Sequence, residues 1–286
     1  MMLVLIVLAI PWYNHLDYYS IHALSPQQQQ QRPRLPIGRI TTLDRTKIDI
    51  KSDTVFYKQP NMIVHTDETF VNKLTALYDE IICNARTQQE DGTKNDTTTT
   101  TTNNNNNGLL ILDIMASHVS HLSPQSYGRV DVHGMNENEL QANTDRIRTN
   151  GKYYVRDFNA NPTLVGIIDD DQYDLILCCV GVQYLEEPEQ VFAELGRIIK
   201  PGGTVVVSFT NTFFYQKALT GWIERGMKER ARLVCDYFRA AGGFEEDTLR
   251  IVGDGTNPMT QLFSLISGGG GSDPFVAVVA TRNNQP

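Results

Sequence analysis

Five residues stand at the ends of four apolar segments of this 286-residue chain: Asp113, Asn136, Asp157, Cys179 and Val180. Each apolar segment is typical of a strand buried in a parallel sheet. In open α/β sheets, ligands bind outside the carboxyl ends of such strands. We therefore expect these five residues to lie close together at one ligand site.

The loop after the first of these segments lacks the glycines that usually follow the first strand of a nucleotide-binding α/β protein. Met115, Ser117 and Val119 stand where a G-x-G-x-G run would fall. Glycine allows backbone torsions closed to other residues, and it allows a ligand to approach closely. Two interpretations stay open: a cofactor site with unusual residues, or a fold that has lost its cofactor.

Three more residues are candidates for contact with a substrate: His118, Tyr184 and Asn211. His118 follows the glycine-free loop, where it could act as a general base near neutral pH or cap a short helix after the loop. Tyr184 follows the fourth strand and Asn211 the fifth. His121 and His133 lie near His118, but no Cys, Asp or Glu accompanies them at metal-ligand spacing, so no metal site is predicted.

Strand-like and helix-like segments alternate along the chain, which indicates an α/β fold with a mostly parallel sheet. Helical periodicity marks residues 66–82, 136–147, 188–200 and 228–241, and apolar runs mark seven strands. The last two strands, near residues 248–253 and 275–282, flank a segment without a helical pattern. We expect them to pair as an antiparallel hairpin.

Several residues mark the beginnings of these helices. Thr66 and Asn136 are predicted N-caps, and Glu139 completes a capping-box pattern with Asn136. Pro188 suits the first turn of the third helix. The first helix should bury one stripe of side chains, composed of Phe70, Leu74, Leu77, Tyr78 and Ile81.

The order of these segments resembles a known family. The segments "ILDIMAS", "VHGMNENEL", "VRDFNANP", "YDLILCCVGVQYLEEP" and "RIIKPGGTVVVSF" are similar to those of class I S-adenosylmethionine-dependent methyltransferases, nearest the type 11 group. The resemblance covers about residues 56–281. "LDIMASHVSHL", "HGMNENELQAN" and "VCDYFRAAGGF" resemble more narrowly an uncharacterised plant, algal and cyanobacterial subgroup.

The resemblance implies a three-layer, Rossmann-like methyltransferase fold, with helices on both faces of the seven-stranded sheet, and it implies site roles. Asp113 would anchor the first loop, and Asn136 or Glu137 would hold the ribose hydroxyls of S-adenosyl-L-methionine. Asp157 would accept a hydrogen bond from the adenine amino group, and Phe158 would donate its backbone amide. Further cofactor contacts would come from the first loop and the fourth strand, at Met115, Ala116, Ser117, Cys179 and Val180.

The predicted function is methyl transfer from S-adenosyl-L-methionine to a small-molecule acceptor. The alternative is a non-catalytic relative, a ligand sensor or an assembly scaffold, with a degenerate cofactor loop. An aromatic-rich segment after the fifth strand, residues 213–215 with Trp222, fits either an acceptor pocket or helix core. Oligomeric state has no signal in the sequence.

The N-terminus and two low-complexity segments set the expected domain organisation. "MMLVLIVLAI" is too short to span a bilayer and resembles the apolar core of a signal peptide, so residues 1–24 are expected to be a targeting segment. A disordered linker is expected at residues 25–54 and the methyltransferase domain at 55–286. The run at residues 91–108 is a polar insertion typical of a eukaryotic genome, such as that of an alga.

Composition narrows the partners and the compartment. The net charge is -8, which disfavours nucleic acid and anionic membranes as partners. The adjacent Cys178 and Cys179 fit neither a disulfide framework nor a zinc site, which favours a reducing compartment. We therefore expect an organelle, such as a plastid, rather than secretion, with the cytoplasm as the alternative.

Overall fold

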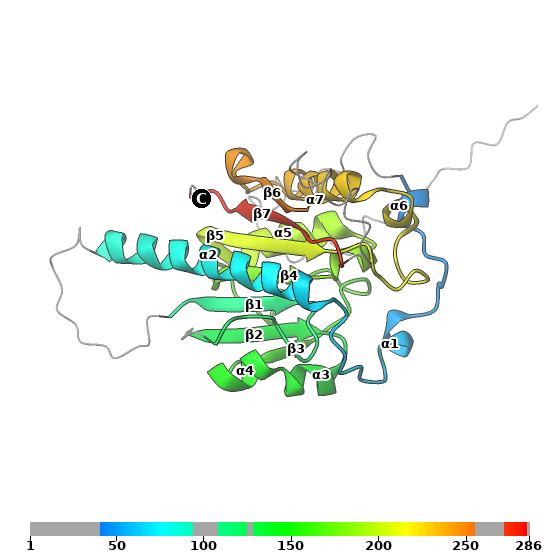
Figure 1. Ribbon diagram of the computed structural model, residues 1–286, viewed down its shortest axis with the longest axis horizontal. Helices are drawn as coiled ribbons and strands as arrows, with labels where there is room; N and C mark the ends of the chain where they lie inside the picture. Colours follow the sequence, from blue (N-terminus) through cyan, green and yellow to red (C-terminus); the bar gives the residue numbers. More distant parts are fainter. Residues whose placement is uncertain (1–40, 94–107, 125–127, 255–271, 285–286) are drawn as a thin grey trace, which may run out of the picture. The chain divides into compact units, whose positions relative to one another are not determined.

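A seven-stranded sheet forms the centre of the computed structural model, with strand order β3-β2-β1-β4-β5-β7-β6 (Figure 1). The structure describes residues 41–93, 108–124, 128–254 and 272–284, all within a compact unit that comprises residues 33–286. The strands are β1 (Leu110–Ile114), β2 (Arg129–Gly134), β3 (Tyr153–Val155), β4 (Tyr173–Cys179), β5 (Ile199–Phe209), β6 (Arg250–Gly253) and β7 (Val276–Thr281).

The pairing confirms the predicted fold class. β1 pairs in parallel with β2 and β4, and parallel pairing continues to β3 and β5. β7 is antiparallel to both β5 and β6, so the last two strands form the expected hairpin. The fold is therefore the three-layer, Rossmann-like methyltransferase fold.

Helices cover both faces of the sheet because side chains alternate between the two faces of each strand. The long helix α2 (Glu68–Thr93) covers one face, and its predicted stripe from Phe70 to Ile81 is buried. The helices α5 (Pro188–Ile198) and α7 (Met227–Ala241) cover the other face (Figure 1). Cys178 and Cys179 point to opposite faces, as their adjacent positions predict.

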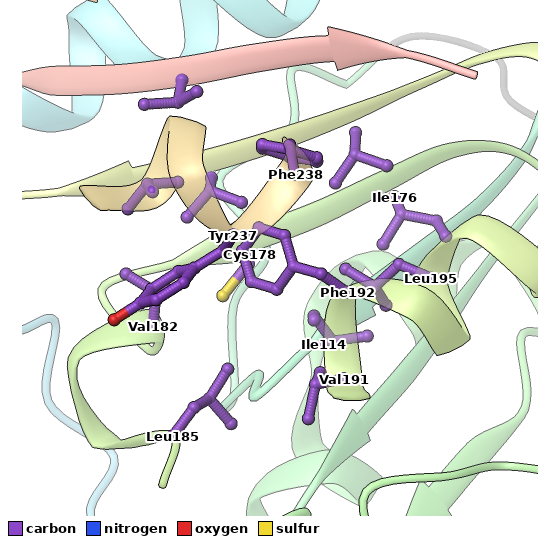
Figure 2. Packing of buried hydrophobic residues seen from close by; sticks show 14 of the residues in the cluster. Ile114, Ile176, Cys178, Val182, Leu185, Val191, Phe192, Leu195, Tyr237 and Phe238 are labelled. Carbon is purple, nitrogen blue, oxygen red and sulfur yellow. The ribbon is translucent and has the colours of Figure 1, made fainter. Parts of the chain in front are cut away.

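The face under α5 and α7 has a dense aromatic and aliphatic core. The ring of Phe192 on α5 packs edge-on against Tyr237 and Phe238 of α7, with centroid distances of 5.5 and 4.7 Å (Figure 2). Trp222, in the short helix α6 (Thr220–Ile223), is buried against Phe209. Trp222 therefore belongs to the core rather than to an acceptor pocket.

Two helix starts differ from expectation. Asp67, not Thr66, caps α2, since its carboxylate accepts from the Phe70 amide at 2.8 Å. The single helix expected at residues 136–147 is two short helices, α3 (Glu137–Ala142) and α4 (Thr144–Thr149), capped by Asn136 and Asn143. The break occurs because Asn143 adopts an extended ψ of 120° and starts a new cap.

The connection from β1 to β2 is irregular in its described residues, 115–124 and 128, so the short helix expected after His118 is absent from them. Polar side chains from α4 support it instead. The Asn143 amide donates to the Ser117 carbonyl, and the Asp145 carboxylate accepts from the Ser120 amide. These bonds satisfy backbone groups that a helix would otherwise have paired.

The residues before α2, numbered 41–66 and called here the N-terminal strap, cross the carboxyl ends of the parallel strands (Figure 1, blue). The strap contains the short helices η2 (Leu43–Arg45) and α1 (Asp53–Phe56). It pairs with residues 216–220 through a bridge between Lys47 and Leu219. The expected disordered linker, residues 25–54, is therefore wrong for residues 41–54.

A buried ionic cluster fixes the strap. The Asp53 carboxylate lies 2.7 Å from the Lys47 ammonium and 3.1 Å from that of Lys217, and all three side chains are buried. The Asn159 amide also donates to Asp53 at 2.9 Å. Removing one member of such a cluster leaves a buried charge without a partner, which is strongly destabilising. The strap is therefore an integral part of the domain.

Some expectations fall outside the described residues: the targeting segment, the linker up to residue 40, and residues 94–107 of the polar insertion. The first residues of that insertion, 91–93, belong to α2. The remaining short helices are η3 (Val182–Tyr184) and η4 (Glu246–Thr248). No helix in the described part of the chain is long and apolar enough to cross a membrane.

Replacing Gly134 by alanine tests how closely the first loop approaches β2. A Cβ at residue 134 would lie 2.6 Å from the Ala116 carbonyl oxygen, which is backbone and cannot move freely. We expect Gly134→Ala to lower the free energy of unfolding by about 2 kcal/mol. Gly196→Ala is the control, since its Cβ would meet Phe244 at an ordinary 3.5 Å within α5. Equal shifts of the urea unfolding midpoints of Gly134→Ala and Gly196→Ala would contradict this account.

Candidate functional site

A cavity that is open to solvent lies at the carboxyl ends of β1 to β4, beneath the N-terminal strap; its empty space, open solvent included, is about 620 Å³. Each of these strands and the strap contribute lining residues. The predicted site residues on its wall are Met115, Ala116, Asn136, Asp157, Phe158, Val180 and Tyr184. Sequence reasoning missed other lining residues, notably Asp53, Tyr57, His133, Glu139, Arg156 and Gly181.

The remaining predicted residues do not line this cavity. They are Asp113, Ser117, His118, Glu137, Cys179 and Asn211. Asn211 is exposed, and His118 contacts Ser117 at 3.2 Å. The geometry therefore brings the strand-end residues together as predicted, but it leaves the proposed base His118 outside the cavity wall.

Two lining residues adopt left-handed backbone conformations that usually favour glycine. Met115 has φ 54° and Val180 has φ 46°. Such conformations cost a non-glycine residue roughly 1–2 kcal/mol, and Val180 is also β-branched. Conformations of this kind cluster at functional sites, where surrounding contacts hold them.

Gly181, just after β4, leaves room for the side chain of Met115, which stands where the first loop would usually have a glycine. Met115 packs against Gly181, where an added Cβ would lie 2.8 Å from the Met115 Cβ. The Ala116 amide donates to the His133 carbonyl at 2.8 Å, which holds the loop against β2. Val119 lies away from the cavity wall, so the space at the strand ends stays open despite the unusual loop.

Asp113 does not anchor this loop in the way the resemblance implied. Its carboxyl is buried on the α2 side of β1, and no hydrogen bond from a loop amide reaches it in the described part of the chain. Burial raises the pKa of Asp113 to about 7, and the side chain of Ser120 offsets this only in part. Among the described residues, no cation compensates the buried Asp113 carboxyl.

Asn136 is confirmed as the N-cap of α3, and its amide is fully engaged. The side-chain oxygen accepts from the Asn138 and Glu139 amides at 3.0 and 3.2 Å. The side-chain nitrogen donates to the Tyr57 and Lys58 carbonyls of the strap at 2.8 and 3.2 Å. An amide offers two donors and two acceptor sites, so none remains for ribose hydroxyls.

The neighbouring acids on α3 point in different directions. Glu137 is exposed and accepts from the Gln141 amide and the Tyr153 hydroxyl, outside the cavity. Glu139 lines the cavity and accepts from the Asn61 amide of the strap at 2.6 Å. The sequence pattern predicted that Glu139 would complete a capping box with the backbone of Asn136. In the structure Glu139 bonds the strap instead.

At the end of β3, the Asp157 carboxylate accepts from the Asn159 amide at 2.8 Å and faces the cavity. The Phe158 ring stacks on the His133 imidazole, with centroids 4.0 Å apart and planes 29° apart. Burial lowers the pKa of His133 to about 3, so this ring is neutral. Within the described residues its Nε2 atom makes no hydrogen bond of ordinary geometry, but the Arg156 backbone lies close enough to favour the charged ring slightly.

The strap side of the cavity is aromatic. Tyr57 and Tyr184 both line it, and Phe214 contacts both rings at centroid distances of 6.4 and 6.2 Å. The Tyr184 hydroxyl accepts from the Phe214 amide. Burial, with the nearby groups Tyr184, Asp53, Glu139 and Asp157, raises the pKa of Tyr57 well above its ordinary value. Both phenols therefore remain neutral near pH 7.

A model of the ubiE/COQ5 methyltransferase family matches residues 70–240, more than half of the chain. The chain belongs to this family. It is thus a class I methyltransferase by family and fold, as the sequence predicts. The family match includes β1 to β5, the helix α5 and most of α7, but excludes the strap.

Solved structures with a similar fold share little sequence with this family member. An S-adenosylmethionine-dependent methyltransferase from Mesorhizobium loti is 15% identical, covering 61% of this chain and 91% of that chain, with a TM-score of 0.40. Phosphoethanolamine N-methyltransferase 2 from Haemonchus contortus, solved with S-adenosyl-L-methionine, is 10% identical, covering 62% and 49%, with a TM-score of 0.39. The [4+2]-cyclase SpnF is 12% identical, covering 62% and 76%, with a TM-score of 0.42. No curated protein sequence matches the chain significantly.

Placing an acid at residue 136 should destabilise this protein. Asn136→Asp keeps the acceptors for α3 but removes both donors to the strap and sets an anion against two carbonyls. We expect a loss of about 2 kcal/mol in the free energy of unfolding. Asn138→Asp, at an exposed position in the same helix, should leave stability unchanged. Denaturation at pH 7 distinguishes the variants, and equal midpoints would contradict the anchoring role of Asn136.

Asp113 should make stability depend on pH. Its pKa rises from 3.8 to about 7 on folding, so the unfolded chain releases this proton at a lower pH than the folded protein. Stability should therefore fall as pH rises from about 4 to about 7. Between pH 5 and 8, we expect the wild type to lose about 3 kcal/mol more than Asp113→Asn. Urea unfolding of both proteins at pH 5 and at pH 8 measures these losses. Equal losses of stability in the two proteins would contradict the role of Asp113.

Proposed function

We propose that this member of the ubiE/COQ5 family transfers a methyl group from S-adenosyl-L-methionine to a small-molecule acceptor. The observation that carries the proposal is the convergence of four strand ends on one cavity. Ala116, Asp157 and Phe158 lie on its wall together, at the places where the resemblance puts cofactor contacts. Family membership supports the same chemistry.

The residues present fit the cofactor. Three carboxylates line the cavity, and Asp53 is neutralised by two lysines. Glu139 and Asp157 have no ion-pair partner within the described residues, and Arg156 is the one cation on the wall. The excess negative charge favours a cationic sulfonium ligand. The neutral His133 imidazole, stacked on the Phe158 ring, lies on the wall beside Asp157.

The chain's own contribution to the reaction is alignment. When bound, S-adenosyl-L-methionine supplies an activated methyl group, and holding donor and acceptor in line contributes several kcal/mol. The aromatic side of the cavity, formed by Tyr57 and Tyr184, suits a planar or apolar acceptor. His118 lies off the wall, so it is not positioned to take a proton from an acceptor bound in the cavity.

The glycine-free loop favours a second candidate, a non-catalytic sensor of the same ligand. Met115 occupies the first glycine position and narrows the β1 side of the cavity against Gly181. The two candidates share the binding site and differ in turnover. We further propose, from the quoted segments alone, that the protein belongs to the plant, algal and cyanobacterial subgroup and works in an organelle.

Calorimetric titration of the full chain with S-adenosyl-L-methionine and S-adenosylhomocysteine tests the proposal. We expect binding in the micromolar range, weakened about tenfold by Asp157→Asn because a hydrogen bond to a charged group is lost. Asp169→Asn is the matched control, since Asp169 is exposed and outside the cavity. Absence of binding at millimolar ligand would rule out both candidates, and binding without turnover across an acceptor panel would favour the sensor.

A further inference from the structure

Arg230, near the start of α7, is a buried cation that no carboxylate neutralises within the described residues. The residue is only 7% exposed, and burial lowers the pKa of its guanidinium without an offsetting acid nearby. Lys217 shows the usual arrangement for a buried cation, because it pairs with Asp49 and Asp53 at 3.2 and 3.1 Å. A guanidinium stays charged in a protein, and a buried charge without a partner is costly. The charge of Arg230 therefore calls for an anion.

Two aromatic rings lie against the Arg230 guanidinium and leave one of its edges available. The Cζ atom lies 4.9 Å from the centre of the Phe213 ring and 5.4 Å from that of Trp222. Nε donates to the Trp222 carbonyl at 2.9 Å, and Nη1 meets the weakly accepting Sδ of Met227 at 3.7 Å. Nη2 donates no hydrogen bond to any residue that the structure describes. The edge formed by Nη1 and Nη2 therefore keeps about three N–H groups for a ligand.

The surroundings of the guanidinium also favour negative charge. It contacts Met227, the first residue of α7, so it lies at the positive end of the dipole of a 15-residue helix. The acids closest to it in sequence, Glu224 and Glu229, are exposed, and Glu229 accepts from the Gly226 amide at 3.0 Å. Neither acid forms an ion pair with Arg230 in the described part of the chain.

This place is separate from the cavity at the strand ends. Arg230 and the two rings are not on the cavity wall. Phe213 packs instead against the core beneath α5 and α7. The next residue, Phe214, contacts the rings of Tyr57 and Tyr184, which do line the cavity. The segment after β5 therefore lies between the cavity and the Arg230 guanidinium.

We propose that Arg230 binds an oxyanion, a carboxylate or phosphate group of a small ligand, at the start of α7. A planar guanidinium binds two oxygens of such a group through two parallel N–H···O bonds. The rings of Phe213 and Trp222 hold the guanidinium in place, so its available edge is fixed before the ligand arrives. The inference does not depend on the proposed methyl transfer, because the site lies outside the cavity.

Thermal unfolding of the full chain with added anions tests the site. The probes are sodium phosphate and sodium benzoate, with sodium chloride used to keep the ionic strength constant. Arg230→Met removes the charge and keeps an unbranched side chain beside the rings. Arg232→Met is the matched control, because it makes the same change at an exposed position of the same helix. Arg230→Lys keeps the charge but lacks the two-pronged edge, so it provides a second comparison if Arg230→Met does not fold.

We expect one or both probes, at about 50 mM, to raise the unfolding midpoint of wild type and Arg232→Met by about 5 °C, as for a dissociation constant of about 1 mM. Arg230→Met should show no rise, and Arg230→Lys a smaller one than wild type. A rise with phosphate alone assigns a phosphate ligand, and a rise with benzoate alone assigns a carboxylate. Equal rises in all the proteins would reveal a general salt effect and overturn the site, as would the absence of any rise in wild type.

Discussion

The hydrogen bonds of the Asn136 side chain join the end of β2 to the strap that covers the cavity. Its oxygen caps α3, and its nitrogen donates to two strap carbonyls. A carboxylate has no donors and could not make the second pair of bonds. The Asn136 side chain is therefore committed to holding the strap over the cavity, and on α3 the acid that lines the cavity is Glu139.

In the first loop, too, one residue departs from the usual pattern and a residue on a neighbouring strand compensates for it. Met115 keeps the left-handed backbone that a glycine would adopt, and Gly181, at the end of β4, leaves room for its side chain. The loss of one glycine is thus tolerated because another lies opposite. Val180 shares the conformation, so both strained residues stand on one cavity wall. Contacts from β2 and β4 maintain a conformation that neither residue favours by itself.

Local patterns predicted the elements well and their ends less well. The stripe of α2, the strands, Pro188 at the start of α5 and the final hairpin follow from periodicity and turn residues. Thr66 was wrong as a cap because Asp67 offers a carboxylate one residue closer to the helix. One helix became α3 and α4 because Asn143 forms a cap in the middle of a continuous helical pattern. Residues 41–54 were wrong as a linker because Asp53 pairs with a lysine far along the chain.

The sequence by itself determined the alternation of strands and helices, and therefore which residues stand at the strand ends. Those properties depend on neighbours a few positions away. The tertiary structure alone decided which side chains face the cavity: Glu139 rather than Glu137, Tyr57 from the strap, and not His118. The physical reason is sequence separation. The bond from Asn136 to the Tyr57 carbonyl joins residues 79 positions apart, and no local pattern records such a contact.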